Sequence, residues 1–441
     1  MKQHVIKKAN RIDEIPNSFS GRPLDGDNLN FYVDTIKERT ADPYRSPIED
    51  IYDACVNPSE DNIFLLMGHT GCGKSTELNK LATRFHEEGF QVRIIKCLDD
   101  LGNSPLYTDL LILVGEALFQ IAAEIGCSPE SKLGSLILEF WNTEIVKNTV
   151  EKDDYAIDIN AGAETGISFF DKIFKAFASI KAGIKLQQTD SKEYKTKIER
   201  RSEHWYNAIA AISDLITEKL DGRQPIIVFE DLDKLDRVDP DIVWDMFSLH
   251  AVNLCNFTFP VIYTFPISLS YDPKYGTLSG FFTENILPMI ELKQYDGSPC
   301  PDSVSVIKQI VLDRADASLI DEETLSLMIA KTGGSLRDLF TVIRNSSIRA
   351  KRRKSGKIEK EDAVVALNTL KTSLAKRIEV KDYEFLNNII KGYKRNIENR
   401  EKLLEMLTGN VVLEYNSERW QDVHPLIVDF LQETESDSRK R

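Results

Sequence analysis

The chain has 441 residues and a formal net charge of −14, and 42% of its residues are hydrophobic. This length is enough for several domains with cores of their own. The acidic balance argues against a protein whose whole surface binds nucleic acid or anionic membranes, although it leaves room for a local basic patch. The six cysteines are scattered, without C-x-x-C pairs, which indicates reduced thiols, no zinc site and a cytoplasmic protein. We also expect no signal peptide and no stable membrane insertion, since no apolar run reaches spanning length.

Residues 1–45 are polar and form an N-terminal extension, and an amphipathic helix is expected around 46–56. An apolar strand at 63–67 then leads into a glycine-rich loop, which leads into a helix at 75–88 that ends at Gly89. The loop has the G-x-x-x-x-G-K-S pattern of a phosphate-binding loop. Its residues are Gly68, His69, Thr70, Gly71, Cys72, Gly73, Lys74, Ser75 and Thr76.

The glycines of this loop allow a tight turn, so that backbone N–H groups and the helix N-terminus face a phosphate. Lys74 is expected to reach the β- and γ-phosphates, and the Ser75 hydroxyl to bind Mg²⁺. A glycine-rich turn without a ligand is the alternative, but the strand and helix on either side argue against it. We therefore predict ATP and Mg²⁺ as the cofactors.

A second strand at 91–98 and a helix at 105–125 follow, and this alternation predicts a parallel sheet with crossover helices. A helical insert is expected at about 128–220. Between 167 and 184 it carries Ile and Phe residues at helical spacing. Three interpretations stay open for this apolar stripe: packing on the protein's own core, a partner or oligomer surface, and a basic amphipathic membrane helix.

A third, buried-type strand at 226–229 ends in Glu230 and Asp231. Ligands bind at the carboxyl edge of such sheets. One carboxylate should hold the hydration shell of Mg²⁺, and the other should orient and deprotonate the attacking water. Alone, this pattern could be a solvated strand end, but the upstream loop makes a catalytic pair the stronger interpretation. Further strands are expected at 257–264 and 289–292, and helices from 303 to 370.

Together, the loop at 68–75, the strand with its acidic end at 226–231, the strand ending in Thr264 and the G-G-S-L-R segment at 333–337 resemble AAA+ or STAND-type P-loop ATPases. The nearest branch is the origin-initiator-like one, with bacterial regulatory ATPases. The resemblance implies that Thr264 is the sensor 1 residue that positions the lytic water. It also implies that Arg337 is the sensor 2 residue of a helical lid. The structural alternatives are a strand-forming threonine and a salt-bridged helix arginine.

Two features depart from this family. The acidic pair begins with Glu rather than Asp, so the division of roles, Glu230 toward the metal and Asp231 as base, is open. No arginine occurs between 238 and 313, where ring-forming members carry an arginine finger. Either a finger comes from elsewhere, such as Arg200 or Arg201, or no hexameric ring forms, which favours a slow switch over a motor. Asp233 and Lys234 are interpreted as helix-capping, charge-balancing residues.

The last seventy residues predict helices followed by a β-hairpin, as in a winged-helix domain. Its acidic residues make it poorly suited to phosphate: Glu414, Glu418, Asp422 and Asp429. The basic run at 344–357, with Arg352 and Arg353, is the better candidate for DNA, and a solvated helix end is its alternative.

The predicted fold class is therefore α/β: a P-loop parallel sheet of the AAA+ type with a helical lid and a C-terminal winged-helix-like domain. The domains are expected at 1–45, 46–296, 297–371 and 372–441. The predicted function is that of a slowly hydrolysing regulatory ATPase that switches a protein client, in a bacterial defence or stress system, as a small homo-oligomer at most. The alternatives are an ATP-dependent DNA-binding initiator, helicase loader or transposition regulator, and a scaffold that binds nucleotide without hydrolysing it.

Overall fold

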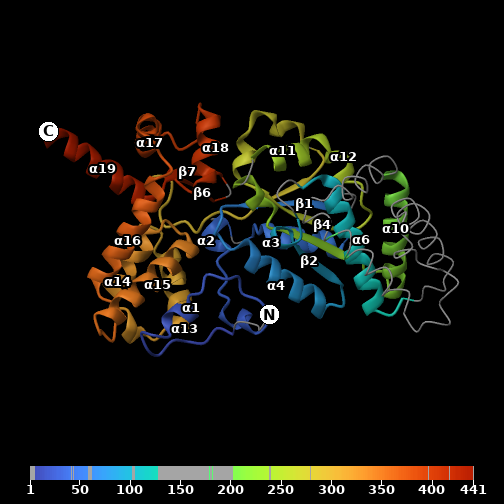
Figure 1. The fold of residues 1–441 in the computed structure, drawn as a ribbon, viewed down its shortest axis with the longest axis horizontal. Coiled ribbons are helices and arrows are strands. Elements are labelled where there is room, and N and C mark those ends of the chain that lie inside the picture. The colour runs from blue at the N-terminus through green and yellow to red at the C-terminus, as the bar shows by residue number, and fades with distance from the viewer. Residues whose placement is uncertain are drawn as a thin grey trace.

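A five-stranded parallel sheet forms the centre of the larger lobe in the computed structural model (Figure 1). The structure describes residues 5–40, 42, 44–57, 62–101, 105–127, 178, 181, 202–237, 240–278, 280–395, 397–416 and 418–440. The strands are β1 (Ile63–Gly68), β2 (Val92–Lys96), β3 (Ile226–Glu230), β4 (Val261–Pro266) and β5 (Thr283–Ile286), in the spatial order β2-β3-β4-β1-β5. All neighbouring pairs are parallel, so the carboxyl ends of β1, β3 and β4 meet at one edge.

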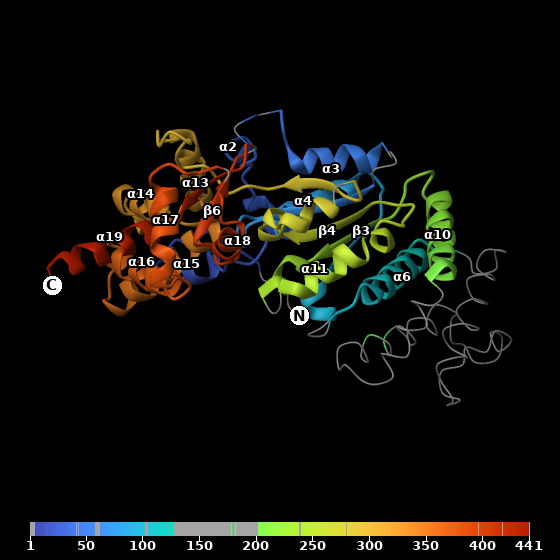
Figure 2. The ribbon, with the colours of Figure 1, turned by 90° about the horizontal axis from the view of Figure 1, so that it is seen from above.

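Helices cover both faces of this sheet (Figure 2). On one face lie α3 (Pro47–Val56) and α4 (Lys74–Glu87), and on the other α6 (Tyr107–Glu124), α10 (Ser202–Lys219) and α11 (Pro240–Leu249). Successive side chains of β1 point to opposite faces of the sheet. Leu65 belongs to the hydrophobic cluster that contains α6 and α10, and Leu66 belongs to the cluster that contains α4. Every residue of β1, β3 and β4 is buried, as expected for strands covered on both sides.

Helix boundaries follow local chemistry. The Ser46 hydroxyl accepts a hydrogen bond from the backbone N–H of Glu49 and so caps α3. Gly89, after α4, has a φ of +86°, a conformation that favours glycine, and this confirms the expected helix end.

Two strand predictions were wrong. The fifth strand is Thr283–Ile286, not 289–292, and Met289 makes only an isolated bridge to Tyr415. Strand β4 runs from Val261 to Pro266, so it begins four residues later than the expected 257 and continues two residues beyond Thr264.

The second lobe consists of the lid and the C-terminal unit. The lid helices are α13 (Pro301–Arg314), α14 (Glu322–Lys331), α15 (Leu336–Arg352) and α16 (Lys360–Ala375). The C-terminal unit contains α17 (Tyr383–Ile390), α18 (Arg400–Thr408), the antiparallel hairpin of β6 (Val412–Tyr415) and β7 (Trp420–Val423), and α19 (Pro425–Lys440). The predicted α/β fold class with a helical lid is confirmed, and the C-terminal helices and antiparallel hairpin are compatible with the predicted winged-helix-like domain. Both views place the hairpin, which we call the C-terminal hairpin (residues 409–424), between the lid and the sheet (Figures 1 and 2).

The N-terminal segment joins the two lobes instead of standing apart. Ala9 bridges Ala315 at the end of α13, and Ile15 and Phe19 belong to the apolar cluster of the lid. The remaining short elements are α1 (Ile15–Ser18), α2 (Lys37–Thr40), α5 (Cys97–Asp100), α12 (Ala251–Leu254) and 3-10 turns over Gly26–Phe31, Leu232–Arg237, Ser268–Tyr271, Pro273–Thr277, Ala317–Leu319 and Val380–Asp382.

The apolar stripe predicted between 167 and 184 lies outside the described residues, as do Arg200 and Arg201. Within that stretch Lys181 is described, and its ammonium pairs with Asp100 at 3.1 Å and Glu116 at 3.0 Å. Among the helices that the structure describes, none combines the length and the apolar character that crossing a membrane requires.

Candidate nucleotide-binding site

The predicted loop residues lie where β1 ends and α4 begins. Gly68, Gly71 and Gly73 have φ values of +156°, +93° and +116°, and Gly73 is the N-cap of α4. A side chain at Gly68 would lie 2.6 Å from the carbonyl oxygen of Leu287, and one at Gly71 would lie 2.7 Å from Cβ of Arg337. The glycines are therefore required both by the backbone turn and by the close approach of neighbouring segments.

Lys74 projects back over this loop. Its ammonium donates to the carbonyl oxygens of Gly68 at 2.6 Å and His69 at 3.1 Å, and forms an ion pair with Asp233 at 2.9 Å. Burial opposes the charge on Lys74, but the nearby Asp233 carboxylate outweighs burial and raises the pKa of Lys74 above its ordinary value. Lys74 is thus held charged at the loop, with the Asp233 carboxylate as its counterion.

The acidic pair lies at the carboxyl edge of β3, beside the loop. Glu230 is buried, and we find no hydrogen bond or ion pair to its carboxylate within the part of the chain that the structure describes. Asp231 has a φ of +74° and forms an ion pair with Lys234. Both residues line the same pocket as Lys74 and Ser75. A buried carboxylate that faces a pocket without a partner fits a site that receives a cation.

Thr264 lies at the same edge, on β4. Its hydroxyl donates to the carbonyl oxygen of Phe229 at 3.1 Å and accepts from the backbone N–H of Leu232 at 3.1 Å. These two backbone groups bracket Glu230 and Asp231. In this structure Thr264 therefore holds the turn that carries the acidic pair, while its side chain also lines the pocket.

Arg337 comes from the lid, in the first turn of α15. The preceding glycines explain how the lid reaches the loop: Gly333 and Gly334 have φ values of +59° and +81°, and a side chain at Gly334 would lie 2.0 Å from the carbonyl oxygen of Ile290. Arg337 packs on Gly71 and lines the pocket with the loop. The structure thus brings together the loop, the acidic pair, Thr264 and Arg337 from four separate segments.

Several pocket residues from the N-terminal segment were missed by the sequence analysis. Arg39 is almost fully buried, and its guanidinium donates to the carbonyl oxygens of Cys72 and Pro288, each at 2.6 Å. Leu24 is hydrogen-bonded to Thr76 and Asn79 of α4. No motif marks these residues, because the contacts bridge 33 to 249 positions in the chain.

The pocket lining also includes two aromatic rings and the buried guanidinium of Arg314. Phe31 and Phe340 line it together with Arg314, whose guanidinium lies 5.8 Å and 5.2 Å from the two ring centroids. Burial lowers the pKa of Arg314 to about 10. The pocket lining therefore combines the polar phosphate loop with aromatic side chains from the N-terminal segment and the lid.

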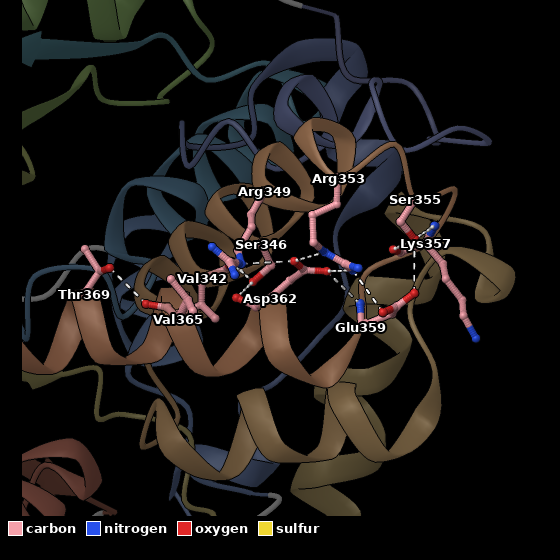
Figure 3. A network of polar contacts seen from close by, with 10 residues as sticks. All are labelled: Val342, Ser346, Arg349, Arg353, Ser355, Lys357, Glu359, Asp362, Val365 and Thr369. Atoms are coloured by element: carbon pink, nitrogen blue, oxygen red, sulfur yellow. Dashed lines mark hydrogen bonds and ion pairs between the residues drawn. The ribbon is translucent and has the colours of Figure 1, made fainter.

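The basic run proposed for DNA lies at the far end of α15, and part of it is occupied by a structural network (Figure 3). The buried Asp362 carboxylate accepts two hydrogen bonds from Arg353, at 3.0 Å and 2.7 Å, and pairs with Arg349 at 3.3 Å. Burial alone would raise the pKa of Asp362, but the hydrogen bonds from Arg353 and from the Glu359 backbone lower it. Arg353 thus ties α15 to α16, whereas Arg352 makes no ion pair with any described residue.

The acidic residues of the C-terminal unit are paired too. Glu414, Glu418, Asp422 and Asp429 form ion pairs with Arg419, Arg395, Lys394 and Lys331 respectively. All four residues of β6 and three of the four of β7 are buried. The hairpin is consequently covered by the rest of the protein and does not project as a free wing.

The chain was compared with protein-family profiles, with curated proteins and with solved structures. No protein-family profile matches the chain, and no curated protein matches it significantly. Among solved structures, it is similar to the Aeropyrum pernix ORC1 protein in complex with DNA, at 11% identity and a TM-score of 0.39, covering 100% of both chains. It is also similar to Cdc6p from Pyrobaculum aerophilum (12% identity, 93% and 99% of the chains, TM-score 0.35) and to Thermotoga maritima RuvB (11% identity, 93% and 98%, TM-score 0.35).

Proposed function

We propose that this protein is a Mg²⁺-dependent P-loop ATPase that acts as a slow nucleotide switch. One observation carries the proposal: the phosphate loop, Glu230 and Asp231 of β3, and Arg337 of the lid line a single pocket. A loop at a helix N-terminus binds phosphate. Carboxylates at the end of the adjacent strand bind the metal ion and the attacking water, and an arginine of the lid neutralises the charge of the γ-phosphate. A nucleoside triphosphate with its metal ion accounts for all three features together.

The residues fit Mg²⁺ bound jointly with a triphosphate. Ser75 offers a hydroxyl and Glu230 a buried, unpartnered carboxylate, while the described residues contain no cluster of three or more ligands for a metal alone. Bound Mg²⁺ would neutralise phosphate charge as it accumulates in hydrolysis. Asp231, whose carboxylate is oriented by Lys234, would position and deprotonate the attacking water.

Arg337 links nucleotide state to the lid. Because it sits on Gly71 and belongs to α15, a γ-phosphate bound at the loop would hold the lid against the core, and hydrolysis would release it. We infer that the output is a change in the position of the lid and the C-terminal unit, read by a protein client. Buried β6 and β7 favour a protein client over duplex DNA in this arrangement. A cytoplasmic role in bacterial defence or stress, and a small oligomer rather than a hexameric ring, complete the proposal by family analogy.

The test measures ATP binding and turnover in the unmodified protein and in three variants. Lys74→Ala should lose ATP binding, and Asp231→Asn should keep binding but lose turnover. Lys308→Ala is a matched control, because Lys308 is a lysine of an exposed lid ion pair. Unchanged hydrolysis in both pocket variants would exclude the assignment. Binding without any turnover in the unmodified protein would instead favour the scaffold alternative.

The DNA-binding alternative has its own test. ORC1 of Aeropyrum pernix was solved with DNA, and the present chain offers Arg352 as a basic residue without an ion pair to any described residue. An ATP-dependent complex with duplex DNA, with a steep salt dependence that weakens in Arg352→Ala, would favour an initiator, a helicase loader or a transposition regulator. Arg353→Ala is a poorer probe, since it would also break the α15–α16 contact. Absence of binding at low salt would remove this alternative.

A further inference from the structure

The imidazole of His69 joins the phosphate loop to the C-terminal hairpin. The backbone N–H of Glu414 donates to Nε2 of His69 at 2.8 Å, and Nδ1 of His69 lies 3.2 Å from Oδ1 of Asn410. The amide Nδ2 of Asn410 donates to the carbonyl oxygen of Thr70 at 3.0 Å. Two successive residues of the loop are therefore held by two residues that follow them by about 340 positions in the chain.

One protonation state of His69 satisfies all of these contacts. A backbone N–H can only donate, so Nε2 of His69 must accept and carries no proton. The neutral ring then has its proton on Nδ1 and donates it to Oδ1 of Asn410, which leaves the Asn410 amide nitrogen to reach Thr70. Burial lowers the pKa of His69 to about 4, so this neutral ring is the form present at physiological pH. Every polar atom in the contact has a partner of the right kind.

Apolar packing supports the contact. Leu413, Tyr415 and Trp420 of the hairpin belong to the same buried cluster as β1 and α4, the two elements that hold the loop. The Tyr415 hydroxyl also donates to the carbonyl oxygen of Gly333 at 2.8 Å. Gly333 begins the segment that brings Arg337 to the loop. The hairpin thus contacts both the phosphate loop and the lid segment that carries Arg337. We expect the relative position of these two parts of the pocket to depend on the bound nucleotide.

We infer that His69 is a positioning residue through which the C-terminal hairpin holds the phosphate loop in its nucleotide-accepting shape. The inference rests on the proposed function and adds the regulation of that same site. Because energetic coupling between two sites is reciprocal, a docked hairpin raises nucleotide affinity, and bound nucleotide strengthens hairpin docking. Undocking, by a client that takes hold of the hairpin, would lower nucleotide affinity.

A double-mutant cycle between the loop and the hairpin tests this coupling. His69→Ala removes both ring contacts. Asn410→Gly removes the amide without backbone strain, because Asn410 has a φ of +53°. The matched controls are His86→Ala, an exposed histidine at the end of α4, and Asn399→Ala, which removes the N-cap of α18. The affinity for fluorescent N-methylanthraniloyl-ATP with Mg²⁺ and the kcat for ATP are measured for each protein.

Each single variant should bind the nucleotide about 5- to 10-fold more weakly, the effect of one or two lost buried hydrogen bonds. The double variant should lose less affinity than the product of the two single losses, because both changes break the His69–Asn410 contact. In Asn410→Gly, which changes a residue outside the phosphate-binding loop, the kcat should change less than about twofold. His69→Gln, which can accept and donate, should recover part of the affinity. Hydrogen exchange at the Glu414 amide should slow with ATP in the unmodified protein but not in His69→Ala.

A purely structural contact would give a different pattern. Losses that multiply in the double variant, or unchanged affinity in folded single variants, would overturn the inference while leaving the ATPase assignment intact. If the unmodified protein binds no nucleotide, the ATPase assignment and the proposed coupling through His69 are both refuted. If His69→Ala does not fold, the nucleotide affinities of Asn410→Gly and Asn410→Asp test the coupling instead, because Asn410 lies outside the loop. Nucleotide affinities equal to that of Asn399→Ala would refute the coupling.

Discussion

The ion pair between Lys74 and Asp233 gives the sharpest prediction about the pocket. Both side chains are buried, with exposed fractions of 7% and 6%, and the two atoms lie 2.9 Å apart. Lys74 must exchange this carboxylate for phosphate when a nucleotide binds. Asp233→Asn should therefore destabilise the nucleotide-free protein but increase its affinity for ATP.

The magnitude follows from the surroundings of Lys74. Leaving one partner of a buried pair without its counterion costs about 3–5 kcal/mol. Because two loop carbonyl oxygens still accept hydrogen bonds from the Lys74 ammonium, we expect a loss of unfolding free energy at the lower end of this range, about 3 kcal/mol. If the chain unfolds as one unit, this corresponds to a Tm lowered by about 3 °C, from a typical unfolding entropy per residue. Phosphate would relieve at least half of the cost, which raises ATP affinity about tenfold.

Thermal unfolding with and without Mg²⁺ and ATP, together with titration calorimetry, measures both quantities. Asp302→Asn is the matched control, because Asp302 forms an exposed ion pair with Lys37 at 3.9 Å. This variant should change neither the Tm nor the affinity for ATP. A variant with normal Tm, or with ATP affinity equal to or below that of the unmodified protein, would refute the reasoning that Asp233 is a counterion displaced by phosphate.

Three further predictions concern the framework of the site. Gly334→Ala should destabilise the protein by about 2 kcal/mol or more in chemical denaturation, because the added carbon would lie 2.0 Å from the carbonyl oxygen of Ile290, whereas Gly356→Ala, with open space around it, should be neutral. Thr264→Val should cost about 1–3 kcal/mol in the same assay and slow ATP turnover by loosening the acidic turn, while Thr264→Ser should behave normally; equal effects of both would contradict the hydroxyl's role. His69, with a pKa lowered to about 4, contributes stability that is full above its ordinary pKa of 6.5 and is lost as pH falls toward 4. The free energy of unfolding should thus fall less steeply in His69→Gln across that range, and identical slopes would argue against a buried neutral ring.

The sequence predicted the elements whose signals are local. The loop pattern between an apolar strand and a helix identified β1 and α4. A turn at 416–418, flanked by the short segments 411–415 and 419–423, identified the C-terminal hairpin. Strand β5 was missed because it lies at the sheet edge and only one of its four residues is buried, so it lacks the apolar run that marked the other strands. Met289, assigned to a strand, is buried because it meets the hairpin, a contact that its neighbours in sequence do not reveal.

The sequence predicted those residues of the candidate site that belong to motifs. Lys74, Ser75, Glu230 and Asp231 belong to recognisable patterns, and all of them line the pocket. Arg39 belongs to no pattern, and its contact with Cys72 depends on how the N-terminal segment crosses the loop. Contacts between distant segments of this kind are set by tertiary packing and leave no periodicity in the sequence.

The central claim is that Lys74 and its loop bind a nucleoside triphosphate with Mg²⁺. Titration calorimetry of Mg²⁺–ATP into the unmodified protein and into Lys74→Ala tests it most directly. The account predicts saturable binding at one site per chain in the unmodified protein and no measurable heat in Lys74→Ala, with the variant still folded by circular dichroism. Equal binding by the two proteins, or none by the unmodified one, would contradict it.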